Sequence, residues 1–125
     1  MSSKAITAFS AFWPFYLGEH RVRLTRTLHF IGSSIAIAGV IAALVTRTFW
    51  LVPMPVIQGY AWAWVSHFFV EKNKPASFGY PLWSFISDFK MLWYFVTGRL
   101  DKELQKYGVQ SLEKGHAATI THRAP

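Results

Sequence analysis

The chain has 125 residues, enough for one domain, of which 52% are hydrophobic and 18% aromatic but only 15% charged. Soluble domains carry about 25% charged residues and keep much of their surface in water, so this composition disfavours an ordinary soluble domain and excludes a disordered chain. Thirteen Lys and Arg against six Asp and Glu give a formal net charge of +7, which leaves a basic nucleic-acid-binding protein or a membrane protein.

The first predicted element covers residues 5–17, where small and aromatic residues surround Pro14. Trp and Tyr prefer the boundary between membrane and water, so we expect a short helix that lies at this interface and ends at Gly18. The segment lacks the continuous apolar core of a signal peptide.

Two long stretches follow without any Asp, Glu, Lys or Arg, residues 27–46 and residues 48–70, separated by Arg47 alone. A bilayer core needs about 20 predominantly apolar residues per helix, so the two stretches predict a transmembrane hairpin. The alternative is a pair of buried helices in a soluble bundle, although such helices would show a charged face that these lack. The first stretch also carries small residues at spacings that favour close helix packing, namely Gly32, Ala36, Gly39 and Ala43.

The second stretch opens with Pro53 and Pro55. Because proline is tolerated in a first helical turn, we expect a continuous helix from near Pro55 to about Val70. Such a helix is short for a full span, so a tilted or re-entrant hairpin is an alternative.

Basic residues flank the predicted hairpin, namely Lys4, Arg21, Arg23 and Arg26 before it and Lys72 and Lys74 after it. Cytoplasmic flanks collect Lys and Arg, so both ends of the hairpin are predicted to face the cytoplasm, in a bacterial inner membrane or the endoplasmic reticulum of a eukaryote. This topology accounts for the charge of +7. No nucleic-acid-binding motif is present, so we expect the lipid bilayer as a partner and no nucleic acid.

The third apolar segment, residues 80–97, carries Asp88 and Lys90 in its middle. Charges are costly at the centre of a bilayer, so we expect an aromatic helix along the cytoplasmic interface; a full crossing is the alternative. A short polar helix over residues 101–114 and a flexible tail over residues 115–125 complete the chain. The predicted fold is an all-α single membrane domain, residues 1–125, with a transmembrane hairpin and interfacial helices.

His29 opens the first stretch and His67 lies near the end of the second. Their midpoint is position 48, at the predicted turn, so an antiparallel hairpin places both imidazoles at similar depth near the cytoplasmic boundary. Glu71 follows His67 by four residues and would project from the same helical face. The chain has no cysteine, but two histidines and a carboxylate are a plausible site for ferrous iron or zinc.

His20 is a further candidate ligand. On one straight helix, His20 and His29 would point about 180° apart and lie about 13 Å from each other along the axis, so they share a metal only if the chain turns between them. The alternative for each histidine is an interfacial side chain that bonds to a carbonyl group. Spacing alone favours neither interpretation.

Residues 12–104 resemble a membrane protein family that converts phytosphingosine to odd-numbered fatty acids, formerly catalogued as a domain of unknown function. The resemblance rests on residues 15–20 (FYLGEH) followed by His29, and on residues 67–76 (HFFVEKNKPA). It implies an Fe(II)-dependent dioxygenase of 2-hydroxy fatty acids, with the family's characteristic histidines at His20, His29 and His67. Glu71 matches the acidic position of the second motif, and its role as a ligand is our own inference.

The implied reaction turns a 2-hydroxy fatty acid and O₂ into the acid one carbon shorter, CO₂ and water, with Fe(II) as cofactor and no further reductant. Arg21 or Lys72 would attract the substrate carboxylate while the acyl chain stays in the bilayer. Two rival hypotheses are a non-catalytic membrane scaffold, in which the histidines only pack and form hydrogen bonds, and a lipid-binding accessory protein. The sequence carries no indication of oligomeric state.

Overall fold

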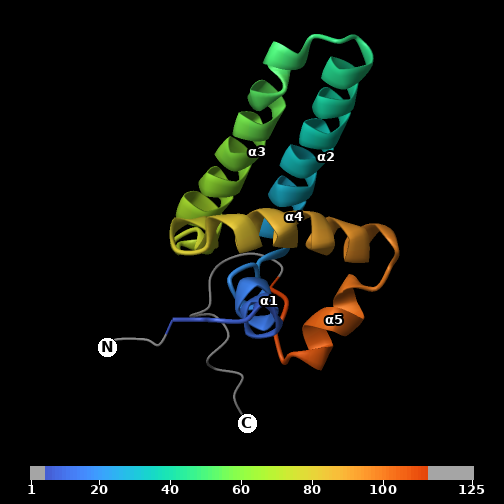
Figure 1. Ribbon diagram of the computed structural model, residues 1–125. Helices are drawn as coiled ribbons and strands as arrows, with labels where there is room; N and C mark the ends of the chain where they lie inside the picture. The colour runs from blue at the N-terminus through green and yellow to red at the C-terminus, as the bar shows by residue number, and fades with distance from the viewer. Residues whose placement is uncertain (1–4, 113–125) are drawn as a thin grey trace.

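The computed structural model describes residues 5–112, and this part of the chain is all-α, as the sequence predicts (Figure 1). The predicted flexible tail, residues 115–125, lies outside the described residues. The helical elements follow one another as α1 (Phe9–Gly18), α2 (Arg23–Val45), the 3-10 turn η1 (Phe49–Leu51), α3 (Pro53–Val65), the π-helical segment η2 (Ser66–Glu71), the 3-10 turn η3 (Ala76–Phe78), α4 (Pro81–Val96) and α5 (Leu100–Lys106).

Helices α2 and α3 lie side by side as a hairpin that projects from the rest of the molecule (Figure 1). The predicted seam of small residues lies between them: a methyl group on Gly39 would come within 2.6 Å of the Pro55 ring, and one on Gly32 within 3.2 Å of the Gly59 carbonyl. The side-chain amide of Gln58 donates a hydrogen bond across this seam to the carbonyl of Gly32 (2.8 Å). The small side chains therefore set the close approach of the two helices.

The second arm of the hairpin differs from the predicted helix in its start and its geometry. Helix α3 begins at Pro53 rather than near Pro55, because both prolines fit its first turn. At Ser66 the α-helix gives way to η2, whose hydrogen bonds join residues five apart. The segment ends at Glu71, where Lys72 takes a left-handed backbone conformation with φ of 64°.

Helix α4 lies across the foot of the hairpin, and α1 and α5 lie on its other side (Figure 1). Residues from α1, α2, α4, α5 and η3 form the buried core between these elements, namely Phe12, Trp13, Tyr16, Leu17, Phe30, Ala76, Met91, Leu100 and Leu104. The predicted polar helix is shorter than expected, because Gly108 takes a positive φ of 70° soon after α5 ends. The hairpin thus stands on a compact helical base.

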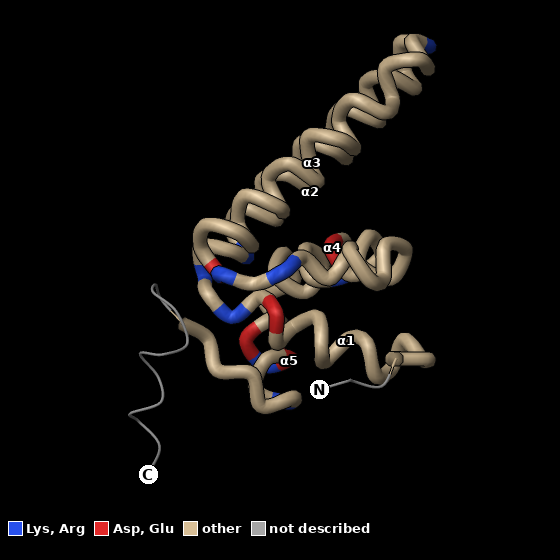
Figure 2. The backbone as a smooth tube through the Cα atoms, turned by 90° about the vertical axis from the view of Figure 1, so that its left-hand side faces the viewer, with Lys and Arg blue, Asp and Glu red and all other residues tan. Residues whose placement is uncertain are grey.

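The surface of the hairpin is apolar. Large apolar side chains are exposed along both arms, including Ile41, Val45, Met54 and Ile57, and Trp50 is exposed in the turn η1 between them. Charged residues gather in the base (Figure 2). Arg47 lies in the turn between α2 and η1, which joins the two arms of the hairpin. Within residues 5–112, one helix, α2, is long and apolar enough to cross a membrane, with a mean hydropathy of 2.1.

Candidate metal centre

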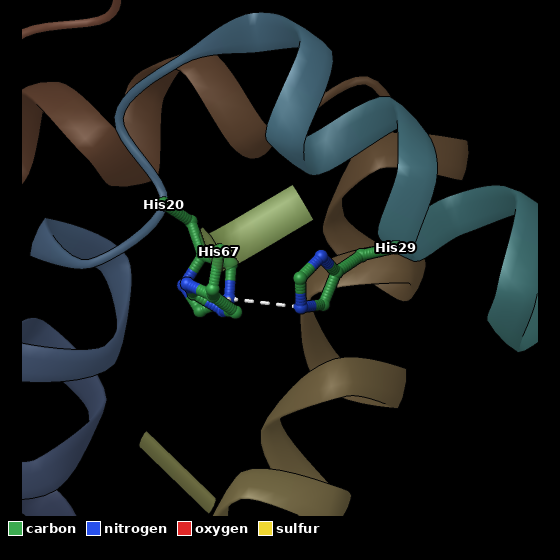
Figure 3. A group of neighbouring side chains, drawn as sticks. All are labelled: His20, His29 and His67. Atoms are coloured by element: carbon green, nitrogen blue, oxygen red, sulfur yellow. Dashed lines mark hydrogen bonds between the residues drawn. The ribbon is translucent and has the colours of Figure 1, made fainter. Parts of the chain in front are cut away.

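Three buried histidines from separate elements meet at the foot of the hairpin. His20 lies in the turn after α1, His29 in α2 and His67 in η2, with exposed fractions of 1%, 3% and 2%. The Nε2 atom of His20 lies 3.1 Å from Nε2 of His29 and 3.0 Å from Nε2 of His67. Figure 3 shows the three rings pointing toward one another from their different segments. The predicted meeting of His29 and His67 across the hairpin is confirmed, and His20 joins them.

The chain turns between His20 and His29, which is the condition for the two side chains to meet. Helix α1 ends at Gly18 and α2 begins at Arg23, so His20 lies in the turn between the two helices and His29 lies in α2. The buried guanidinium of Arg26 donates hydrogen bonds to the carbonyl groups of His20 (2.8 Å) and Arg21 (3.0 Å). Arg26 therefore holds the connecting turn against the start of α2.

The second nitrogen of each ring faces an oxygen atom, which fixes the position of its proton. Nδ1 of His20 donates to the Tyr16 carbonyl (2.6 Å), and Nδ1 of His29 donates to the Thr25 carbonyl (3.0 Å). Nδ1 of His67 donates to the side-chain oxygen of Asn73 (2.7 Å). A carbonyl oxygen only accepts, so the proton of each neutral ring lies on Nδ1 and the lone pair on Nε2. The amide nitrogen of Asn73 donates to the Glu19 carbonyl (3.2 Å), which aims its oxygen at His67.

Three Nε2 lone pairs consequently face one another with no proton between them, which is unfavourable unless a cation lies among them. Two imidazole nitrogens bound to one metal at right angles, each at about 2.0–2.1 Å, would lie about 3 Å apart, as these do. Burial lowers the pKa of His20 well below its ordinary value, and the adjacent His29 and His67 rings lower it further. Neutral imidazole is the form that binds metals, so the three side chains fit a divalent metal ion.

Asp88 and Tyr16 border the three histidines, and sequence reasoning did not assign them to the site. Oδ1 of Asp88, in α4, lies 4.0 Å from Nε2 of His29 and accepts a hydrogen bond from the Tyr16 hydroxyl. The Tyr16 ring stacks on His20 with 4.1 Å between ring centroids. Burial raises the pKa of Asp88 to about 7, against the opposing effect of the Tyr16 hydrogen bond, so a nearby cation would favour its ionised form.

Glu71 lies near these residues, but the structure does not bring its carboxylate into the group. Its oxygens accept hydrogen bonds from the backbone N–H groups of Arg21 and Val22 and from the Thr25 hydroxyl (3.0 Å). These donors surround the N-terminus of α2, where a negative charge is stabilised. A shared face for Glu71 and His67 requires an α-helix, and the π-helical geometry of η2 changes the direction in which Glu71 projects relative to His67.

Replacing Glu71 by Ala is expected to destabilise the protein by about 2–3 kcal/mol, because charge-assisted hydrogen bonds are lost and their donors are left without an acceptor. The Glu71→Gln variant keeps one carbonyl oxygen and should lose less. Thermal unfolding in detergent measures the effect, and elemental analysis measures the bound metal. If Glu71→Gln loses its metal but unfolds at the wild-type temperature, Glu71 is a metal ligand. Its hydrogen bonds to the start of α2 would then contribute little to stability.

Arg21 and Lys72, the residues predicted to attract the substrate carboxylate, line a separate cavity of about 250 Å³ together with Glu71 and Asn73. Neither residue lines the two small cavities beside the histidines, which measure about 10 and 20 Å³. Each of these small cavities has room for about one water molecule. The role of Arg21 and Lys72 in substrate binding stays a prediction.

Comparison with protein-family models matches residues 6–100 to the family described as 2-hydroxy-palmitic acid dioxygenase Mpo1-like. The match covers about three quarters of the chain and includes all three histidines and Asp88. Comparisons with curated proteins and with solved structures give no match. On the family match, the chain belongs to the 2-hydroxy-palmitic acid dioxygenase Mpo1-like family.

Proposed function

We propose that this protein is an Fe(II)-dependent dioxygenase that shortens 2-hydroxy fatty acids by one carbon. The observation that carries the proposal is the convergence of three histidine Nε2 lone pairs, each ring oriented by a hydrogen bond from Nδ1. The family to which the chain belongs carries the name of such an enzyme. Imidazole ligands with a carboxylate nearby are typical of non-haem Fe(II) oxygenases.

The proposed reaction balances without another reductant. A 2-hydroxy acid and O₂ give the acid one carbon shorter, CO₂ and water: the bond between C1 and C2 breaks, C1 leaves as CO₂, and C2 becomes the new carboxyl carbon. His20, His29 and His67 would hold the iron, which when bound supplies the redox chemistry with O₂.

Asp88 is the residue best placed to handle the proton of the substrate hydroxyl. Its Oδ1 atom is 4.0 Å from Nε2 of His29, and the Tyr16 hydroxyl holds the carboxylate in position. A substrate hydroxyl among the Nε2 atoms would lie beside this carboxylate. In the proposal, Asp88 accepts the hydroxyl proton as the bond between C1 and C2 breaks.

The hairpin formed by α2 and α3 is proposed to lie in the bilayer, with both of its ends on the cytoplasmic side. Its exposed apolar surface and the absence of charge from residues 27–46 and 48–70 support this placement. Helix α4 would then lie at the interface, crossing the foot of the hairpin (Figure 1). The three histidines would lie at the boundary where a fatty acid keeps its carboxyl group in water and its chain in lipid.

The reaction itself can be tested with protein purified in detergent and loaded with Fe(II) without air. On addition of oxygen, 2-hydroxypalmitate is expected to yield pentadecanoic acid and CO₂ in equal amounts, quantified by mass spectrometry. Protein loaded with Zn²⁺ is the control and should yield neither product, because zinc has no redox chemistry. Iron-loaded protein that leaves 2-hydroxypalmitate unchanged would contradict the proposed substrate and favour the lipid-binding alternative.

A further inference from the structure

An apolar groove runs along the outer face of α3 and ends next to the histidines. One wall consists of four residues on one face of α3, namely Ile57, Tyr60, Ala61 and Trp64. The other wall consists of Ser77 in η3 and Pro81 at the start of α4. The groove has a volume of about 440 Å³, far larger than the cavities beside the Nε2 atoms. We refer to it as the α3 groove.

The α3 groove adjoins the small cavity at the metal centre, because the two share lining residues. Tyr60, Trp64 and Ser77 line both the groove and the small cavity that borders His20, His29 and His67. The indole N–H of Trp64 donates to the Ser77 hydroxyl over 3.4 Å, so this pair joins α3 to η3 at the point where the two spaces meet. A ligand that lies in the groove therefore has one end at the Trp64 and Ser77 pair, next to the histidine rings.

We propose that the α3 groove binds the acyl chain of a single fatty acid, whose carboxyl end enters past Trp64 and Ser77 toward the Nε2 atoms. This inference rests on the proposed function. The apolar walls suit methylene groups, whereas the cavity at the histidines is too small to hold the chain, so the chain must lie outside it. From Trp64 to Ile57 the groove follows α3 for about 10 Å, and the exposed side chain of Met54 continues this apolar path toward the tip of the hairpin.

Photo-crosslinking locates the chain without depending on turnover. Iron-loaded protein in detergent, kept free of oxygen, is irradiated with palmitic acid that carries a diazirine at a mid-chain carbon, and labelled residues are identified by mass spectrometry. The label is expected on residues 57–64, displaced by 2-hydroxypalmitate but not by dioleoyl phosphatidylcholine. Label spread evenly over the exposed face of α2, or displaced by the phospholipid alone, would overturn the proposal.

A matched pair of substitutions tests the groove by filling it. Ala61 is an exposed wall of the groove, whereas Ala38 is exposed on α2 and lines none of the described cavities. Ala61→Trp should reduce crosslinking to residues 57–64 at least about tenfold, the effect of excluding two buried methylene groups. Ala38→Trp should leave crosslinking unchanged, and both variants should bind iron as the wild type does. Ile57→Trp is a second filling variant, also at an exposed position, should Ala61→Trp fold poorly.

Turnover separates a failure of this inference from a failure of the proposed reaction. Ala61→Trp is expected to lose turnover of 2-hydroxypalmitate but keep that of 2-hydroxyoctanoate, whose shorter chain needs less of the groove. If Ala61→Trp and Ile57→Trp both turn over 2-hydroxypalmitate as fast as the wild type, the groove does not bind the acyl chain, although the proposed reaction still holds. If the diazirine label on residues 57–64 is displaced by 2-hydroxypalmitate but the protein turns over neither acid, the groove is a fatty-acid site and the proposed reaction is wrong.

Discussion

Replacing His20 by Ala is expected to lower the affinity for Fe(II) by more than about 100-fold and to abolish turnover. Loss of a hydrogen-bond partner behind a metal ligand already costs about 10–100-fold in affinity, and loss of the ligand itself should cost more. His20 is the central residue of the three, because its Nε2 atom is within 3.1 Å of both other Nε2 atoms. Anaerobic Fe(II) titration of detergent-purified protein measures the change.

Two controls separate a ligand from a buried side chain that only packs. Added imidazole should restore part of the iron binding in His20→Ala, because it can enter the space left by the ring. Asn73→Ala removes the oxygen that orients His67 through Nδ1, together with the amide's hydrogen bonds to Glu19, but it removes no metal ligand. Its loss of affinity should therefore fall within the about 10–100-fold range and not beyond it. If His20→Ala bound iron as tightly as the wild type, the three histidines would not be the metal ligands.

Replacing Asp88 by Asn is expected to reduce kcat by about 10²–10⁴-fold, the usual contribution of a positioned acid or base, while iron remains bound. The amide has nearly the same shape as the carboxylate and can still accept a hydrogen bond from Tyr16, but it cannot take up the hydroxyl proton. Steady-state product formation from 2-hydroxypalmitate, normalised to bound iron, measures the effect.

The matched control for Asp88 is Asp101→Asn, which changes an exposed carboxylate in α5 and should leave both kcat and iron binding unchanged. Tyr16→Phe removes the hydroxyl that holds Asp88 and should give a smaller loss of kcat than Asp88→Asn. If Asp88→Asn lost its iron together with its activity, Asp88 would be a metal ligand. If it kept full activity, Asp88 would have no part in the reaction.

Much of the hairpin could be predicted because its determinants are local in the sequence. The uncharged stretches set the lengths of the two arms, and the small residues from Gly32 to Ala43 define the packed face of α2. His29 and His67 could be paired from their positions in the chain, since residues equally far from the turn of an antiparallel hairpin lie at equal depth. These predictions needed only spacing and residue size.

The composition of the metal centre was harder to predict, because it depends on local geometry and on distant contacts. The place of His20 depends on a turn held by Arg26, a contact that the sequence does not reveal; the local signal for the turn is weak and consists mainly of Gly18, where the first helix ends. The position of Glu71 depends on a π-helical segment, for which the sequence carries no local signal. Asp88 stood out as a charge in an aromatic segment, but its partner Tyr16 lies 72 residues away, so its role could not be assigned.

Anaerobic Fe(II) titration can show whether the three histidines hold iron. The wild type is titrated beside a variant in which His20, His29 and His67 are all replaced by Ala. Circular dichroism confirms that both proteins retain their helices. We expect the wild type to bind one ferrous ion per chain and the triple variant to bind none. A wild-type chain that takes up no iron, or a triple variant that binds it equally well, would contradict an iron site formed by these three histidines.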